Sequence, residues 1–278
     1  MSGVLQSARA HSLPHELLSA SQAEDRFDAF TLDPDVSVVY EEGAGVLFAE
    51  ECVRAMVGLA EESGCGFGFS ERVTGWKSTG DGVVVTSDRG SYEAETVVFC
   101  AGPWTSEILG GVVPLKCERQ VPMLFPSQGE ACFSPERMPV FIMEETPGRF
   151  FYGIPELGQG VKVAITHEGA IVDPDSVERS VTDEDKAPVE AFVSRRLKRL
   201  GSSPIASTTC LYSNTPDLAF AVGRHPKEPR AIVVSACSGH GFKFASVLGE
   251  VVSDMAVGRR NPLDVSWLGL ERFSAGKP

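Results

Sequence analysis

The most informative stretch of the sequence is AIVVSACSGHGFKF, residues 231–244. Its apolar beginning, 231–236, predicts a buried strand, and residues 245–257 carry apolar side chains at the spacing of a helix. The turn between them, SGHGFK at 238–243, therefore brings together backbone N–H groups and the positive end of a helix dipole. Because Lys243 adds a positive charge, the turn favours an anion or an electron-rich ring. A lone GxG turn also joins strands to helices without any ligand.

The segments before this turn alternate between helical and strand patterns. Residues 46–64 have apolar side chains at helical spacing and end at Gly64. Three strand-like runs follow, and the third, 96–100, is apolar after Thr96, which predicts a short strand buried on both faces. Four further runs between 117 and 172, broken by Pro and Gly, predict a largely antiparallel sheet, and residues 173–200 predict helix.

This order of elements predicts an α/β and α+β protein built from two interleaved units. We expect 41–110 and 205–275 to form one unit, similar to the rear part of a nucleotide-binding domain. Residues 111–204 are expected to form a second unit, a mixed, largely antiparallel sheet. The polar residues 1–40 have poor periodicity and predict an irregular or helical segment.

Composition excludes several classes of function. The net charge of −13 disfavours nucleic acid and anionic membranes as partners, because both would repel the protein. The seven cysteines are widely spaced, odd in number and lack a CxxC pair, which disfavours disulfide frameworks and zinc sites and indicates a reducing cytoplasm. No secretory signal opens the sequence, and no apolar run reaches the roughly 20 residues that span a bilayer.

Three single residues attract attention, each with an ordinary interpretation beside a functional one. Lys162 lies inside the apolar run VKVAI, so it either faces solvent by alternation or is buried with a lowered pKa. Cys210 and Tyr212 precede the turn sequence NTPD, where a cysteine is usually a small buried hydrophobe and a tyrosine a core aromatic.

Taken together, the motifs are more specific than any one of them. Four motifs follow one another along the chain: VVFCAGPW (97–104), FFYGIP (150–155), CLYSNTPD (210–217) and SGHGFKF (238–244). Their order matches that of a known family, and their spacing nearly does. The chain resembles the monomeric sarcosine oxidase and N-methyltryptophan oxidase family of FAD-dependent amine oxidases from about residue 40 to about residue 275. Several independent motifs would have to coincide for this resemblance to arise by chance.

The resemblance implies an FAD-binding domain of the glutathione reductase type, here incomplete, interleaved with a mixed-sheet substrate domain. Cys210 takes the position of a cysteine that forms a thioether to the flavin 8α-methyl group, and Tyr212 that of a tyrosine beside the substrate. Lys243 would bind the substrate carboxylate. The turn that covers the pyrimidine end of the flavin would contain Gly239, His240, Gly241 and Phe242.

Other positions follow from the same resemblance. Lys162 matches a lysine near flavin N5, where a cation would stabilise superoxide as oxygen is reduced, and Tyr152 matches an active-site tyrosine. Arg72 and Val73 match a strand whose backbone contacts the adenosine half. The turn along the cofactor would contain Ala101, Gly102 and Trp104.

Two departures from the family pattern stand out. No strand–GxGxxG–helix unit, acidic ribose ligand or arginine-rich loop precedes Glu41, and the GxGxG at 64–68 runs from helix to strand, the reverse of a phosphate-binding loop. In addition, Thr166 stands where relatives often have an active-site histidine, and His167 is one position later.

The first hypothesis is therefore an enzyme that oxidises a secondary or N-methyl amino acid with FAD and O₂, giving an imine and hydrogen peroxide. The alternative is a truncated or degenerate relative without flavin, which acts as a binding module or needs a partner that supplies the dinucleotide-binding unit. A third hypothesis is a relative with non-covalent flavin that acts on glycine or D-amino acids, which Cys210 disfavours.

Overall fold

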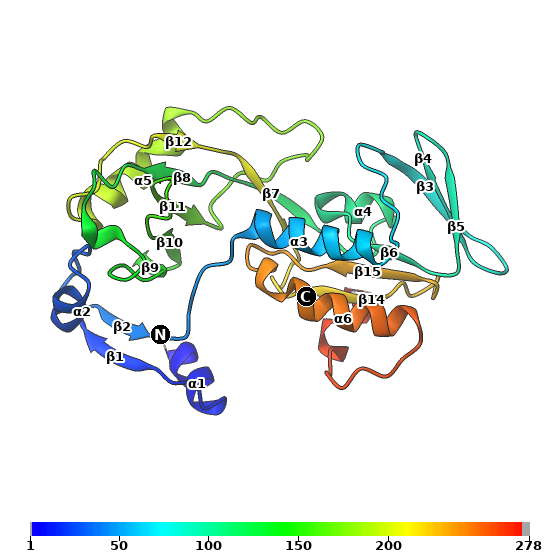
Figure 1. Ribbon diagram of the computed structural model, residues 1–278, viewed down its shortest axis with the longest axis horizontal. Coiled ribbons are helices and arrows are strands. Elements are labelled where there is room, and N and C mark those ends of the chain that lie inside the picture. The colour runs from blue at the N-terminus through cyan, green and yellow to red at the C-terminus, as the bar shows by residue number, and fades with distance from the viewer. Residues whose placement is uncertain (1, 274–278) are drawn as a thin grey trace. The chain divides into compact units, whose positions relative to one another are not determined.

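The computed structural model describes residues 2–273, which divide into two compact units (Figure 1). Unit 1 comprises the chain up to Val46 together with 120–170 and 178–210, and unit 2 comprises 47–119, 171–177 and the chain from Leu211. The N-terminal residues are thus part of unit 1. They form α1 (Ser2–Ala10), β1 (Glu16–Ser19), α2 (Ala20–Arg26) and β2 (Ser37–Tyr40).

Unit 1 is built on a five-stranded antiparallel sheet with the order β12-β8-β11-β10-β9. The strands are β8 (Met123–Phe125), β9 (Phe141–Thr146), β10 (Arg149–Ile154), β11 (Val161–Thr166) and β12 (Ala206–Ser207), and a short helix, η2 (Ala131–Phe133), follows β8. The antiparallel sheet expected in this region is therefore present. One face carries Phe151, Val161 and Val163, all buried in the core.

Helix α5 (Asp183–Arg196) covers that buried face. It begins at a capping box, in which Thr182 and Asp185 bond each other's backbone N–H groups, and this explains why the helix starts about ten residues later than the helical pattern. The ring of Phe192 stacks on Phe151 with centroids 4.1 Å apart, which joins the helix to β10.

Unit 2 contains three small sheets. The strands β3 (Val73–Ser78), β4 (Val83–Ser87) and β5 (Ser91–Ala94) form an antiparallel meander, and β7 (Lys116–Gln120) pairs with β13 (Cys210–Asn214). The third sheet has the order β14-β15-β6, from β14 (Ala221–Arg224), β15 (Ala231–Ser235) and β6 (Val97–Phe99). Strands β15 and β6 are parallel, as a nucleotide-binding domain requires.

The helices of unit 2 surround these sheets. They are α3 (Ala49–Glu62), η1 (Gly102–Trp104), α4 (Thr105–Ile108), η3 (Phe242–Phe244), α6 (Ala245–Ala256), η4 (Ser266–Leu268) and η5 (Leu270–Phe273). Helix α6 buries Leu248 and Val252 beside β15, whereas α3 has no buried residue. Among residues 2–273, every helix is too short or too polar to cross a lipid bilayer.

One expectation about the buried strand is wrong. Phe99 of β6 lies in the core, but Val98, on the opposite face, is 38% exposed. Among the described strands β6 pairs only with β15 and forms an edge of its sheet, and the described residues leave the face that carries Val98 partly uncovered. An apolar strand is buried on both faces only when neighbouring elements cover both.

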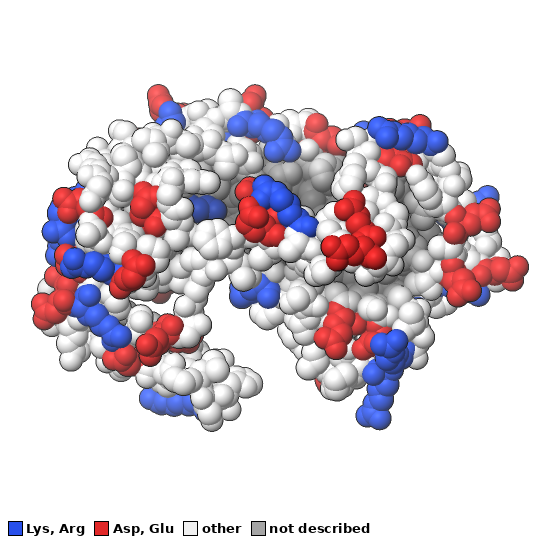
Figure 2. All heavy atoms as spheres, viewed as in Figure 1, with Lys and Arg blue, Asp and Glu red and all other residues white. Residues whose placement is uncertain are grey.

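Charged side chains of both signs are interspersed over the face shown in Figure 2, in each unit taken by itself. In unit 1, for example, Arg196 pairs with Glu145 at 2.7 Å and with Asp33 at 2.6 Å. The face shown in Figure 2 therefore carries no large field of one sign.

Candidate active site

The glycine-rich turn lies between β15 and a continuous helix formed by η3 and α6. Ser238 and Gly239 have φ values of 41° and 76°, which reverse the chain direction. At Gly241 a Cβ atom would clash with the carbonyl oxygen of Ala236, so only glycine fits there. The first N–H groups of the helix, which lack partners within the helix, therefore point out of this turn.

Strand β13 lies directly alongside the turn. The N–H of Ser238 donates to the carbonyl of Ser213 at 3.1 Å, and the N–H of Ser213 donates to Sγ of Cys237 at 3.4 Å. A Cβ atom on Gly239 would lie 2.6 Å from Cε2 of Tyr212, so the tyrosine ring rests on the glycine backbone. The structure thus brings Tyr212 and the turn together, and Cys210 shares the strand face of Tyr212 by alternation.

The side chains of the turn are fixed mostly by local contacts. Lys243 Nζ donates to the carbonyl of His240 at 2.8 Å, which uses one of its three donors. Nδ1 of His240 contacts the carbonyl of Ser238 at 2.8 Å, and the imidazole stacks on Phe220 with centroids 4.8 Å apart. The ring of Phe242 is exposed. The ammonium group of Lys243 therefore stays near the helix N-terminus, where both stabilise negative charge.

The second expected turn, Ala101–Trp104, forms η1 directly after β6. Indole Nε1 of Trp104 donates to Oδ1 of Asp175 at 3.0 Å, and Oδ2 of Asp175 lies 3.6 Å from Nη2 of Arg72. The backbone N–H and C=O of Arg72 both bond Asp88, at 3.1 Å and 2.9 Å, while Val73 begins β3. Asp175 therefore links two segments that are each expected to contact the cofactor.

Asp175 itself was not identified as a site residue from the sequence. The sequence offers only the short motif DPD at 173–175 as a local signal. Its partners Trp104 and Arg72 precede it by 71 and about 100 positions, so no local pattern announces the contact.

Tyr152 and Lys162 belong to unit 1, on adjacent strands of its sheet. Tyr152 pairs with Ala164 and Lys162 pairs with Ile154, so both side chains lie on the sheet face opposite the core. Both are half-buried. Thr166, which pairs with Phe150, is the last residue of β11 on this same face. His167 follows the strand with φ 60° and is not part of the strand alternation.

Two buried hydroxyl groups lie near the carboxyl ends of the parallel strands. Oγ of Ser235, the last residue of β15, and Oγ1 of Thr105, six residues after β6, have no hydrogen-bond partner among the described residues. Ligands of parallel sheets bind at this end of the strands. Together with the helix N-terminus, Lys243 and the ring of Tyr212, this donor set fits a flavin, which is planar and gains negative charge when reduced.

Comparison with known proteins defines the class of this protein. The family model described as FAD dependent oxidoreductase matches residues 2–255, and the chain belongs to this family. It is 37% identical to the monomeric sarcosine oxidase of Streptomyces avermitilis over 264 residues, which cover 92% of this chain and 68% of that protein. It is 31% identical to an N-methyl-L-tryptophan oxidase of Yersinia pestis, over 98% of this chain and 73% of that protein.

Solved structures agree with this fold. NikD, an unusual amino acid oxidase essential for nikkomycin biosynthesis, superposes in its open form with a TM-score of 0.82 at 23% identity, over 96% of this chain and 71% of that one. Glycine oxidase from Geobacillus kaustophilus gives a TM-score of 0.80 at 16% identity, over 95% and 68%. The resemblance predicted from the motifs, the two-domain flavoprotein fold and FAD as the cofactor are therefore confirmed.

Proposed function

We propose that this protein oxidises a secondary or N-methyl amino acid and uses O₂ as the electron acceptor. FAD, when bound, would supply the two-electron redox chemistry: the substrate carbon loses a hydride equivalent and the amine nitrogen loses a proton, which gives the imine, and the two electrons and two protons reduce O₂ to hydrogen peroxide. The observation that carries the proposal is the position of Tyr212 on Gly239, at the turn where Lys243 and the N-terminus of the η3–α6 helix meet. FAD-dependent amine oxidation is also the activity of the related sarcosine and N-methyltryptophan oxidases.

The proposed site residues act either by binding the substrate or flavin or by stabilising charge. Lys243 binds the substrate carboxylate through the ammonium protons that His240 does not use. Tyr212 forms one wall beside the substrate, and Tyr152 is the other tyrosine that the family resemblance assigns to the active site. Lys162, on the same sheet face as Tyr152, stabilises superoxide. Cys210 forms the covalent bond to the flavin.

We further propose that the ADP half of FAD is held by a dinucleotide-binding unit outside the 278 residues, in the same or a partner chain. Two features of unit 2 support this. The edge strand β6 exposes Val98, and helix α3 exposes Val53, Met56 and Leu59. Apolar edges and helix faces of this kind are normally covered. The free thiols of all seven cysteines support a reducing, cytoplasmic location.

The function is tested in protein that is loaded with FAD in the presence of the dinucleotide-binding unit. Under anaerobic conditions, sarcosine or another N-methyl amino acid should bleach the flavin absorbance, and admission of air should restore it with one equivalent of hydrogen peroxide. Lys243→Met should lower kcat/KM by about 10- to 100-fold, because a charged hydrogen bond is worth about 1.5–3 kcal/mol. The matched control is Lys227→Met in the same unit, which should retain full activity.

The outcomes separate the hypotheses. Failure of every N-methyl amino acid to bleach bound flavin would contradict the proposed reaction. Failure to bind FAD, even with a dinucleotide-binding unit present, would instead favour the flavin-free binding module. Bleaching by glycine or D-amino acids alone would support the third hypothesis.

A further inference from the structure

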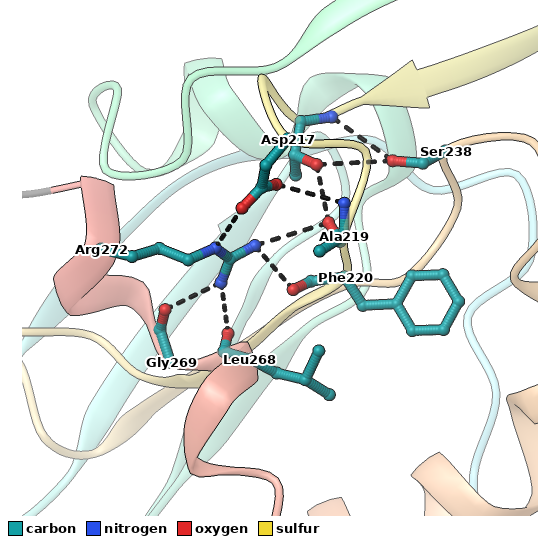
Figure 3. A network of polar contacts seen from close by, with 8 residues as sticks. Asp217, Ala219, Phe220, Ser238, Leu268, Gly269 and Arg272 are labelled. Carbon is teal, nitrogen blue, oxygen red and sulfur yellow. Dashed lines mark hydrogen bonds and ion pairs between the residues drawn. The ribbon is translucent and has the colours of Figure 1, made fainter. Parts of the chain in front are cut away.

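Arg272, in the last described helix η5, cross-links two loops of unit 2 (Figure 3). Its Nη1 donates to the carbonyls of Leu268 and Gly269 at 2.7 Å and 2.8 Å. Its Nη2 donates to the carbonyls of Phe220 and Ala219 at 2.7 Å and 3.4 Å. Such a fork of donors is specific to arginine, because lysine offers only one nitrogen.

Asp217 completes this cluster on the other side of the guanidinium. Its Oδ2 accepts from Nε of Arg272 at 2.8 Å, and its Oδ1 accepts from the N–H of Ala219 at 3.1 Å. Burial raises the pKa of the Asp217 carboxyl, but hydrogen bonds from Arg272 and Thr215 outweigh burial, so the net shift is downward. Asp217 is therefore ionised at neutral pH and keeps Arg272 in place.

Two contacts connect this cluster to the glycine-rich turn. The first runs through Thr215, whose Oγ1 donates to the carbonyl of Ala219 at 2.6 Å and lies 3.5 Å from Oγ of Ser238. The N–H of Thr215 also donates to Oγ of Ser238 at 3.4 Å. The second runs through Phe220, whose carbonyl accepts from Arg272 while its ring stacks on His240.

Ser238 is the residue at which such support is needed. It is 1% exposed and adopts φ 41°, in the left-handed region that residues with a side chain rarely occupy. This conformation costs free energy and persists only where the surroundings impose it. The Thr215 contacts act on Ser238 at the point where the chain turns toward Lys243.

We propose that Arg272 and Asp217 are positioning residues of the active site, which hold the turn Ser238–Lys243 in the conformation that presents its backbone N–H groups and Lys243 to the flavin. Neither residue belongs to the turn, and they act on it through Thr215 and Phe220. The inference depends on the proposed function only for the identity of the ligand, since the contacts lie within unit 2 alone.

The first test needs no flavin. Hydrogen exchange by mass spectrometry is followed in the peptide 236–244 of the wild type, Arg272→Lys and Arg224→Lys. Arg224 is a matched control because its guanidinium also donates to two backbone carbonyls of unit 2, those of Pro229 and Met255. Arg272→Lys should speed exchange in this peptide by about 5- to 10-fold, as expected for the loss of one net hydrogen bond. Arg224→Lys should leave it unchanged.

A second variant covers the case in which Arg272→Lys does not fold. Thr215→Val keeps the shape of the side chain but removes the hydroxyl that joins Ala219 to Ser238, so it should also speed exchange in 236–244. Thr74→Val is its control, because the Thr74 hydroxyl also donates to a backbone carbonyl of unit 2, that of Thr86. Unchanged exchange in Thr215→Val, or equal acceleration by the control, would overturn the inference.

A third measurement reports on the ligand. In protein loaded with FAD, Arg272→Lys should lower the midpoint reduction potential of the flavin, because displaced N–H groups and Lys243 stabilise its reduced form less well. Arg224→Lys should not. An unchanged potential in Arg272→Lys would contradict the positioning role. An altered potential in a protein that oxidises no amine would contradict the proposed function and leave this role standing.

Discussion

Trp104 and Asp175, 71 residues apart, are joined by a hydrogen bond of 3.0 Å from indole Nε1 to Oδ1. The same carboxylate approaches Arg72, so one acidic side chain connects the turn after β6 to the residue that precedes β3. Both segments are proposed to contact FAD. A single carboxylate thereby sets the spacing between two parts of the proposed cofactor site.

Asp175→Ala removes the hydrogen-bond acceptor of Trp104 and should make the Ala101–Trp104 turn more mobile. The variant should lower the free energy of unfolding by about 0.5–1.5 kcal/mol, the usual value of one hydrogen bond, while the exposed pair with Arg72 adds little. The ¹⁵N-indole resonance of Trp104 should move toward its solvent-exposed position. Asp175→Asn keeps an acceptor and should retain most of the stability, so equal losses in both variants would show that the hydrogen bond is not what matters.

His225 predicts a pH dependence of stability in unit 2. It is 8% exposed, and its Nδ1 accepts from the N–H groups of Lys227 at 3.3 Å and Glu228 at 3.1 Å, which requires the neutral ring. Burial lowers the pKa of His225 below 6.5, so the unfolded chain binds a proton at a higher pH than the folded one. The stabilising contribution is therefore complete above pH 6.5 and is lost as the pH falls through the lowered folded-state pKa.

The measurement is urea unfolding at pH 7.5 and pH 5.5, where most carboxylates remain ionised. The wild type should be less stable at the lower pH. His225→Asn offers a neutral acceptor that does not titrate. Its free energy of unfolding should therefore differ less between pH 7.5 and pH 5.5 than that of the wild type. Equal differences in the two proteins would assign the pH dependence to other groups.

Lys162 is expected to act on oxygen and not on the amine. In protein loaded with FAD, Lys162→Met should slow the reoxidation of reduced flavin by O₂ by orders of magnitude, because the positive charge that stabilises superoxide is lost. Anaerobic reduction by substrate should change far less. Lys77→Met, on an exposed position of β3, serves as the control for removal of a lysine. Equal slowing of both half-reactions would instead indicate a role in packing or binding.

Local sequence patterns predicted those parts of the site whose structure depends on residues close together in the sequence. The strand, glycine-rich turn and helix at 231–257 appear as β15, the Ser238–Lys243 turn and α6, because periodicity and glycine positions are local properties. Alternation along β11 does not say which face of the sheet carries Lys162. The structure shows that its side chain lies on the face opposite the core, because the register of the strands identifies the buried face.

Contacts between distant segments could not be predicted in this way. The Arg272–Asp217 and Trp104–Asp175 pairs join residues 55 and 71 positions apart, and no sequence pattern marks them. The burial of Val98 was predicted wrongly for a related reason. Its apolar run is typical of a strand covered on both faces, but which elements cover β6 is a property of the whole fold and not of the run.

Cys210 should hold the flavin covalently. In protein loaded with FAD, the yellow colour should remain with the polypeptide after acid precipitation, because a thioether survives denaturation. Cys210→Ala should release the flavin into the supernatant, whereas Cys52→Ala, on helix α3, should not. Release of flavin from the wild type would show that the cofactor is bound without a covalent bond.

The final prediction concerns residues 1–278 expressed alone, which should purify colourless or with less than one FAD per chain. FAD affinity depends heavily on the pyrophosphate, which normally sits at a helix N-terminus after a GxGxxG turn. This sequence contains no such turn in a strand-to-helix context, and its net charge of −13 disfavours a diphosphate without neutralising partners. Arg72, the Ala101–Trp104 turn and the Ser238–Lys243 turn offer contacts to the rest of the cofactor only.

Flavin absorbance and peroxide production with sarcosine measure the outcome, with a full-length monomeric sarcosine oxidase as the positive control. Stoichiometric flavin with turnover in the 278-residue chain would contradict the prediction and show that its own residues build a phosphate site.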